Sequence, residues 1–219
     1  ALAAGGVVSL ASAKLDGAAV GATGAGTISS EKLALNIDWT AQGPFRAGAL
    51  EIAGAAKGTG AITGSLAEPA LKLAADFESI DLPRLPLRQA HLDLTFRRGA
   101  NGSDGDARLT AASDYGPARI GAAFRFAEGG LDLTNIDADA GGVQAKGALS
   151  LRRARPSTAD LTVAVGPGAL LANGRIGGTV RIADAPGGAR ARIDLTAENA
   201  LLYTSNLSIA AAKITGVPR

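Results

Sequence analysis

The sequence predicts an all-β protein made of antiparallel strands that present one apolar and one polar side. Apolar residues recur at every second position through most of the chain, which is the period of a strand. Dipeptides that form tight turns separate these segments. No segment keeps the 3.6-residue apolar period of a helix over three turns. Glycine accounts for 30 of 219 residues and aromatic residues for only 4%, so Leu, Ile, Val and Ala must supply the apolar side.

The first half of the chain contains three segments with clear alternation. Successive side chains on a strand point to opposite faces, so each segment presents one apolar and one polar edge. The intervening Asp38, Asp76 and Asp93 are predicted to face water. We interpret the apolar stretch around Val8 and Leu10 as a strand rather than a leader peptide, because no charged segment precedes it. The predicted apolar residues are Leu33, Leu35, Ile37, Leu71, Leu73, Phe77, Leu92, Leu94 and Phe96.

The second half of the chain repeats the same alternation. Glycines interrupt several of its strands. Gly147, Gly177 and Gly178 fall inside predicted strands, where glycine permits strong curvature. The predicted apolar residues are Phe124, Phe126, Leu131, Leu133, Leu149, Leu151, Leu161, Val163, Val165, Ile176, Val180, Ile182, Ile193 and Leu195.

Turn-forming dipeptides fall between the strands and predict short connections. Strands joined by short turns are antiparallel neighbours, and the spacing gives about a dozen strands. The prolines of residues 82–86 cannot lie in a central strand, so this stretch is predicted to be a loop and a weak internal boundary. The predicted turns include Asp16-Gly17, Asn101-Gly102, Asp104-Gly105, Gly129-Gly130, Gly141-Gly142 and Gly166-Pro167.

A sheet with one apolar face must cover that face or curl around something apolar. Open twisted sheets rarely exceed ~10 strands without curling or splitting. The sequence therefore predicts an elongated, curled antiparallel sheet with a hydrophobic inner face. Residues 1–219 are predicted to form a single section of a longer repetitive groove, with the predicted apolar residues lining that groove.

Composition excludes several classes of function. The chain has no cysteine, so neither disulfides nor thiolate metal sites are possible. The net charge is only +2 and aromatic residues are scarce, which argues against nucleic-acid binding. No stretch of about 18 continuous apolar residues predicts a membrane-spanning helix. No cofactor or metal is predicted.

The motifs with catalytic or metal-binding resemblance are weak. His91 is the single histidine and lies near Asp93, but the alternation places both on the polar side without a nucleophile nearby. Residues 135–146 resemble the start of a calcium loop, but the glycine is displaced and the twelfth residue is Lys146. Ser29 and Lys32 fit S-x-x-K without its companion motifs. The chain is therefore predicted not to be an enzyme.

Two basic clusters remain, and each has two interpretations. Arg152, Arg153 and Arg155 form the denser cluster, and Arg97 and Arg98 form the other. Either cluster is typical of a solvated strand end, and either would also suit the rim of a groove that meets anionic head groups.

Three runs of sequence carry a resemblance to a known family. The run GAITGSLAEPALKL at 60–73 is similar to a recurring phrase of the TamB proteins, which belong to the AsmA-like group. The run LPLRQAHLDL at 85–94 is similar to the phrase that often follows it. The runs DLTNI at 132–136 and GGVQAKGAL at 141–149 resemble a third phrase. The likeness covers most of the chain and rests on the spacing of residue types more than on invariant residues.

The resemblance implies a periplasmic protein of Gram-negative bacteria, anchored to the inner membrane through a segment not in this chain. It implies a β-taco fold, a long folded sheet with a hydrophobic groove that accepts phospholipid acyl chains. The implied roles are lipid transport between the two membranes and outer-membrane protein assembly, with an outer-membrane barrel partner of the TamA/BamA type. The alternative is a structural β-repeat of a secreted or surface protein, such as an adhesin stalk, with a closed core.

Overall fold

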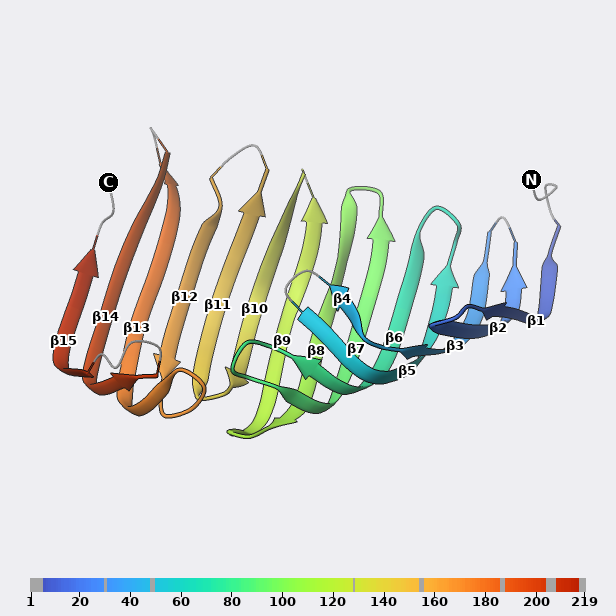
Figure 1. Ribbon diagram of the computed structural model, residues 1–219. Coiled ribbons are helices and arrows are strands. Elements are labelled where there is room, and N and C mark those ends of the chain that lie inside the picture. The colour runs from blue at the N-terminus through green and yellow to red at the C-terminus, as the bar shows by residue number, and fades with distance from the viewer. Residues whose placement is uncertain are drawn as a thin grey trace. The chain divides into compact units, whose positions relative to one another are not determined.

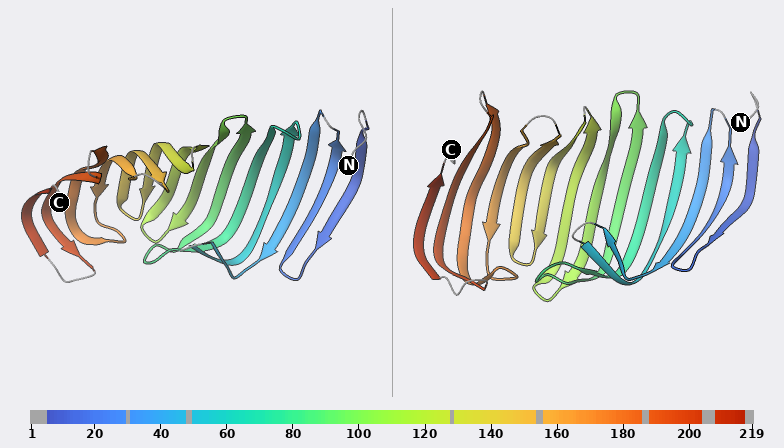
Figure 2. Two further views of the ribbon diagram at one scale, coloured as in Figure 1. Left: turned by 90° about the horizontal axis from the view of Figure 1, so that it is seen from above. Right: turned by 45° about the horizontal axis from the view of Figure 1, so that its top comes forward.

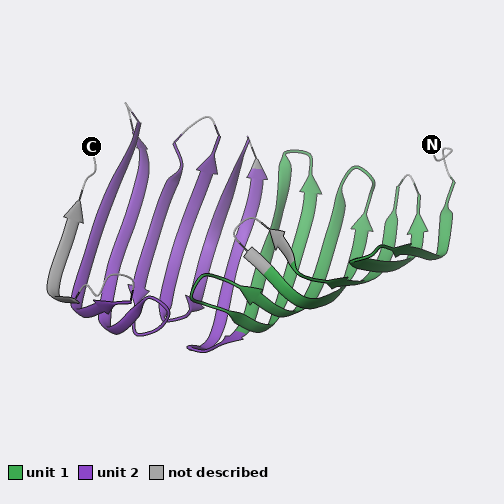
Figure 3. Cartoon of the chain, in the orientation of Figure 1, with its two compact units in different colours: residues 1–111 green, residues 112–219 purple. Residues whose placement is uncertain are grey.

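The fold of this chain is all-β. The computed structural model describes residues 6–29, 31–47, 50–127, 129–153, 156–185, 188–203 and 208–216. Its described residues form antiparallel strands and contain no helix, which confirms the predicted fold class. None of them belongs to a helix that is long and apolar enough to cross a membrane. The chain divides into two compact units, residues 1–111 and 112–219 (Figure 3).

Unit 1 is a sheet whose strands follow one another in chain order (Figure 1). The order is β1-β2-β3-β5-β6-β7-β8, and the short β4 pairs with β5. The strand β8 extends two residues past the unit boundary at Ala111. The strands are β1 (Val8–Asp16), β2 (Val20–Ile28), β3 (Leu33–Gln42), β4 (Phe45–Ala47), β5 (Leu50–Gly64), β6 (Pro69–Asp81), β7 (Leu87–Gly99) and β8 (Gly102–Ser113).

Unit 2 has the same sequential arrangement, with the order β9-β10-β11-β12-β13-β14-β15. In neither unit does the strand order close on itself. The strands are β9 (Gly116–Ala127), β10 (Gly130–Ala140), β11 (Val143–Arg152), β12 (Thr158–Val165), β13 (Leu171–Ala185), β14 (Gly188–Leu202) and β15 (Ser208–Gly216).

Most predicted turns connect consecutive strands, and one prediction was wrong. The turn between β7 and β8 lies at Asn101, as expected. Asp104-Gly105 lies inside β8 instead, because Asp104 faces Arg97 across the hairpin and pairs with it. The proline loop 82–86 joins β6 to β7, which pair with each other within unit 1.

Bulges bend the longer strands. A bulge places an extra residue in one strand, and the strand bends there. The β5–β6 register shifts between Ala53 and Ala56, where Gly54 has a φ of 79°. In unit 2 the registers of β10 shift beside Asn135, whose φ is 52°. The bends in β5, β6 and β7 lie near the end that carries loop 82–86 (Figures 1 and 2).

Three glycines inside strands adopt a backbone conformation closed to other residues. Gly26, Gly147 and Gly178 have φ values of 144°, 140° and 150°. A Cβ on any of them would lie about 2 Å from a carbonyl oxygen of the neighbouring strand. The predicted role of Gly147 and Gly178 in curvature agrees with this geometry. Gly177 differs, because its φ is not positive and a Cβ there would be 3.6 Å from the nearest atom.

The buried core is small and consists mainly of alanines. Among the described residues, Leu87 and Leu171 are the large side chains that are fully buried. Leu171 packs with Ala197 and Ala200, and Val165, Ile176 and Leu202 lie against them. No described polar or charged side chain is buried. Each unit therefore lacks the continuous core of large side chains that a two-layer sandwich builds between its sheets.

Candidate functional site: an apolar sheet face

Strand register places the predicted apolar residues of unit 1 on one side of the sheet. Directly paired residues of antiparallel strands share a face. Leu35 pairs with Ile62, Ile62 with Leu71, and Leu71 with Phe96. The same holds one row further along, at Leu73 and Leu94. We call this side the apolar face of unit 1, and it carries Leu33, Leu35, Ile37, Leu71, Leu73, Phe77, Leu92, Leu94 and Phe96.

Unit 2 has an apolar face of its own. Phe126 pairs with Leu131 and Leu131 with Leu151. Val163 pairs with Gly178, which pairs with Leu195. The bulge at Asn135 corrects the alternation of β10, so that Ile136 returns to the same face opposite Gly147. The face carries Phe124, Phe126, Leu131, Leu133, Leu149, Leu151, Leu161, Val163, Val165, Ile176, Val180, Ile182, Ile193 and Leu195.

Most of these apolar residues are partly buried but remain accessible to solvent. The structure describes all of the predicted apolar residues. Among them only Leu33 is buried, at 8% exposed. Phe126 and Leu151 are openly exposed, at 48% and 42%, and the rest are half-buried. Within each unit, no second layer formed by the described residues therefore covers the face.

Alanine accessibility shows which side of each sheet is the concave one. On the apolar face, Ala75 and Ala90 are 2% and 1% exposed. On the opposite face of the same strands, Ala74 is only half-buried. Unit 2 repeats the contrast, since Ala159 is buried and Ala164 is exposed on the other side. Side chains converge on the inside of a bend, so the apolar face is the inner one within each unit.

The opposite side of each sheet, which we call the polar face, carries a network of exposed ion pairs. In unit 1, Arg97 pairs with Asp104 at 3.1 Å. In unit 2, Arg181 pairs with Asp160 at 3.2 Å, and Arg175 pairs with Glu198. Exposed pairs of this kind contribute little each to stability. These charges keep the polar face hydrated. The apolar face is therefore the side available to an apolar ligand.

Asp132 is the most heavily engaged carboxylate on this polar face. It accepts a hydrogen bond from Ser150 Oγ at 2.6 Å and pairs with Arg152. The hydrogen bond from Ser150, together with Arg152 and the nearby Arg125, lowers the pKa of Asp132. This cluster ties the end of β11 to β10.

His91 lies on the polar face of unit 1 between two carboxylates. Its Nδ1 is 2.7 Å from Asp76 Oδ1, and its Nε2 is 3.5 Å from Asp93 Oδ1. Lys57 lies directly opposite Asp76 in the register of β5 with β6. The hydrogen bond to Asp76 raises the pKa of His91 above 6.5, with a smaller contribution from Asp93. The side chain is half-exposed, so the arrangement is a solvated charge cluster.

The raised pKa of His91 gives a testable pH dependence. Protonated His91 stabilises the fold fully below pH 6.5, and this contribution disappears as the pH rises through the raised pKa. Because the chain has one histidine, its imidazole resonances in an NMR titration are unambiguous. We expect Asp76→Asn to lower the measured pKa more than Asp93→Asn does. A native pKa at or below 6.5, or an unchanged pKa in Asp76→Asn, would contradict this assignment.

Hollows at three places in the described part of the chain have polar lining residues that lie on the polar face. One of them, of about 800 Å³, is lined in part by Thr40, Lys57 and Asp76 in unit 1. A second hollow of about 420 Å³ in unit 1 includes Asp93, and one of about 550 Å³ in unit 2 includes Arg175. Charged side chains form part of the wall of each hollow, and an acyl chain placed against them would remove those charges from water.

The sequence motifs that resemble catalytic or calcium-binding motifs have structural roles in this fold. The Ser29 hydroxyl accepts a hydrogen bond from the Lys32 backbone N–H at 2.9 Å, which closes the β2–β3 turn. Asp137 pairs with Lys146, and Asp139 accepts a hydrogen bond from Gln144. No group of three potential metal ligands occurs in the described part of the chain.

Sequence reasoning missed part of the apolar face. In β1, Val8, Leu10 and Leu15 pair with apolar-face positions of β2, on either side of a bulge. The signal was present, but the bulge interrupts the two-residue period. Arg155 lies outside the described residues.

Comparison with protein-family models, curated proteins and solved structures finds no significant match to this chain. Function must therefore be argued from the apolar face and from the sequence resemblance.

Proposed function

We propose that this chain is a section of a TamB/AsmA-like periplasmic protein that guides lipid acyl chains along its apolar face. The role is transport between the inner and outer membranes, with outer-membrane protein assembly as an associated role. The partner proposed from the resemblance is an outer-membrane barrel of the TamA/BamA type. The anchor to the inner membrane would lie outside this chain.

One observation carries the proposal: within each unit the concave face is apolar and is not covered by a second layer of side chains. Among the large apolar side chains predicted for this face, Leu33 alone is buried. A sandwich or adhesin-like repeat would close such a face with side chains from a facing sheet. Soluble proteins rarely leave a long apolar surface open unless something binds there.

Burial alone is sufficient for this role. Each methylene transferred from water contributes about 0.8 kcal/mol, so an acyl chain is held by aliphatic walls without polar contacts. Leu, Ile, Val and Ala make a smooth surface that does not specify one position, so a flexible chain can slide along it. The mechanism needs no nucleophile, acid or base, and the chain is proposed not to be an enzyme.

Site-specific photo-crosslinking tests the proposal directly. A photoreactive residue at Leu35, Leu73 or Val163, one at a time, should capture phospholipid during expression in a bacterial envelope. A photoreactive residue at Asp76 or Asp93 should not, although both line hollows on the polar face. The measurement is mass spectrometry of the crosslinked adducts.

The polar-face positions are matched controls for Leu73, because Asp76 lies in the same strand, β6, and Asp93 lies in the adjacent strand β7. Equal labelling of both faces would refute the proposal. Absence of lipid from every adduct, and from the purified chain in native mass spectrometry, would favour the structural β-repeat. That second candidate draws support from the closed clusters around Leu87 and Leu171.

A further inference from the structure

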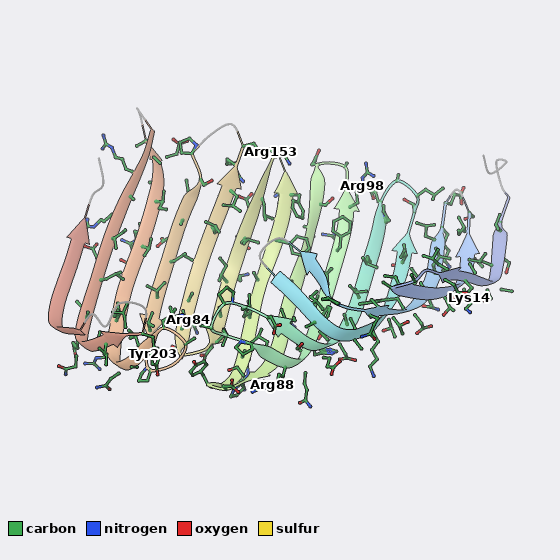
Figure 4. The ribbon with its side chains drawn as sticks, in the orientation of Figure 1. Lys14, Arg84, Arg88, Arg98, Arg153 and Tyr203 are labelled. Atoms are coloured by element: carbon green, nitrogen blue, oxygen red, sulfur yellow. The ribbon has the colours of Figure 1, made fainter. Side chains whose placement is uncertain are left out.

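Two arginine pairs occupy equivalent positions in the two units. The run LTFRR ends at Arg98 in β7, and the run LSLRR ends at Arg153 just after β11. Each run continues an alternating apolar row to the end of its hairpin. Figure 4 shows Arg98 and Arg153 at the turn ends of these strands.

The first arginine of each pair is already engaged on the polar face. Arg97 Nη2 is 3.1 Å from Asp104 Oδ2 across the β7–β8 hairpin. Arg152 pairs with Asp132, which Ser150 also contacts. Arg97 and Arg152 therefore link neighbouring strands at the hairpin ends, and Asp104 and Asp132 neutralise their charges.

The second arginine of unit 1 lies on the apolar face. Leu94, Phe96 and Arg98 are two residues apart in one strand, so their side chains share a face. Across β2, β3, the 56–64 part of β5, the 69–77 part of β6 and the 90–99 part of β7, Arg98 is the charged residue on that face. It is exposed and has no ion pair within the described chain. An unmatched cation thus ends this uncharged part of the apolar face.

In unit 2 the second arginine lies one residue beyond the end of β11. Arg153 follows Leu151 by two residues, and it is exposed without an ion pair among the described residues. The neighbouring Phe126 and Leu151 are the most exposed of the predicted apolar residues, at 48% and 42%. An apolar surface beside a cation is complementary to a ligand with an apolar chain and an anionic end.

We propose that Arg98 binds the anionic head group of a monomeric amphiphile whose acyl chain lies on the apolar face, and that Arg153 does so in unit 2. This inference rests on the proposed function and adds a head-group preference to it. From Phe96 to Ala90 the apolar row of β7 spans about 20 Å at the rise of a strand. One leaflet of a bilayer holds its chains in about 15 Å, so the row has room for one chain.

The chain contains an internal reporter for unit 1. Trp39 is its single tryptophan and lies on the apolar face, where its indole covers Gly58. A brominated acyl chain that enters this face should quench Trp39 fluorescence. The probes are 9,10-dibromostearate, which is anionic, and its neutral monoglyceride, which has the same chain.

We expect the native chain to bind the anionic probe about fivefold more tightly than the neutral one, the upper range for an exposed charge pair. Arg98→Gln should abolish the preference, and Arg98→Lys should keep most of it. Arg97→Gln removes the same charge from the opposite face and should leave the preference unchanged.

The outcomes separate the two proposals. Quenching by both probes with equal affinity, or an equal loss of preference in Arg97→Gln and Arg98→Gln, would overturn the head-group assignment and leave the acyl-chain face intact. If neither probe quenches Trp39 fluorescence, the proposed function is contradicted as well. Sedimentation with anionic vesicles without quenching by monomeric probes would assign the arginines to membrane contact and overturn the inference.

Discussion

Replacing Gly178 with alanine is expected to lower the free energy of unfolding by about 3 kcal/mol or more. Gly178 has a φ of 150°, a conformation that residues with a Cβ rarely adopt. The added Cβ would also lie 2.0 Å from the carbonyl oxygen of Asp194 in β14. Since that oxygen belongs to a paired strand, the clash can be relieved only by shifting backbone. Urea denaturation followed by circular dichroism measures the loss.

The neighbouring residue provides the control. Gly177 precedes Gly178 in β13, has no positive φ, and has room for a Cβ 3.6 Å from the Val163 carbonyl oxygen. Gly177→Ala should therefore change stability by less than about 1 kcal/mol. If the two substitutions cost the same, the curvature of β13 does not depend on Gly178.

Truncating Leu87 to alanine is expected to cost about 3 kcal/mol. Leu87 is fully buried where β6 and β7 bend, opposite Ile80, and its removal would leave a cavity in the small core of unit 1. Thermal or urea unfolding of the purified chain reports the change.

Leu66→Ala is the matched control, because Leu66 lies in the β5–β6 turn at 52% exposed. That variant should unfold within about 0.5 kcal/mol of the native chain. Similar stability of Leu87→Ala and Leu66→Ala would mean that this small core does not hold the bend.

The two-residue period made the strands and their faces predictable. Leu73 and Asp76 fall on opposite sides because they are three positions apart, and an odd offset along a strand changes the face. Strand pairing then aligns the faces of neighbouring strands. Where the two-residue period is interrupted, the sequence did not predict which side chains point inward. Gln89 and Asn199 adopt positive φ inside strands, and each break changes which residues point inward. Leu87 and Leu171 lie beyond such breaks or beside loops, so alternation alone did not mark them as the buried leucines.

The candidate site was predictable as a list of residues but not as an accessible surface. Alternation assigns Leu94 and Val163 to an apolar side, yet it cannot say whether another layer covers that side. The significance of Arg98 also required the structure. Only the partner of Arg97 across the hairpin reveals which of two adjacent arginines is already neutralised.

The sequential strand order has a consequence for how the fold is maintained. Within each unit a strand touches mainly the strands before and after it in the chain, so its stability depends on those neighbours. Damage to one hairpin is then shared with the adjacent hairpins and weakens with each further strand. Such a chain can lengthen or shorten by whole hairpins during evolution, while the remaining hairpins keep their local contacts.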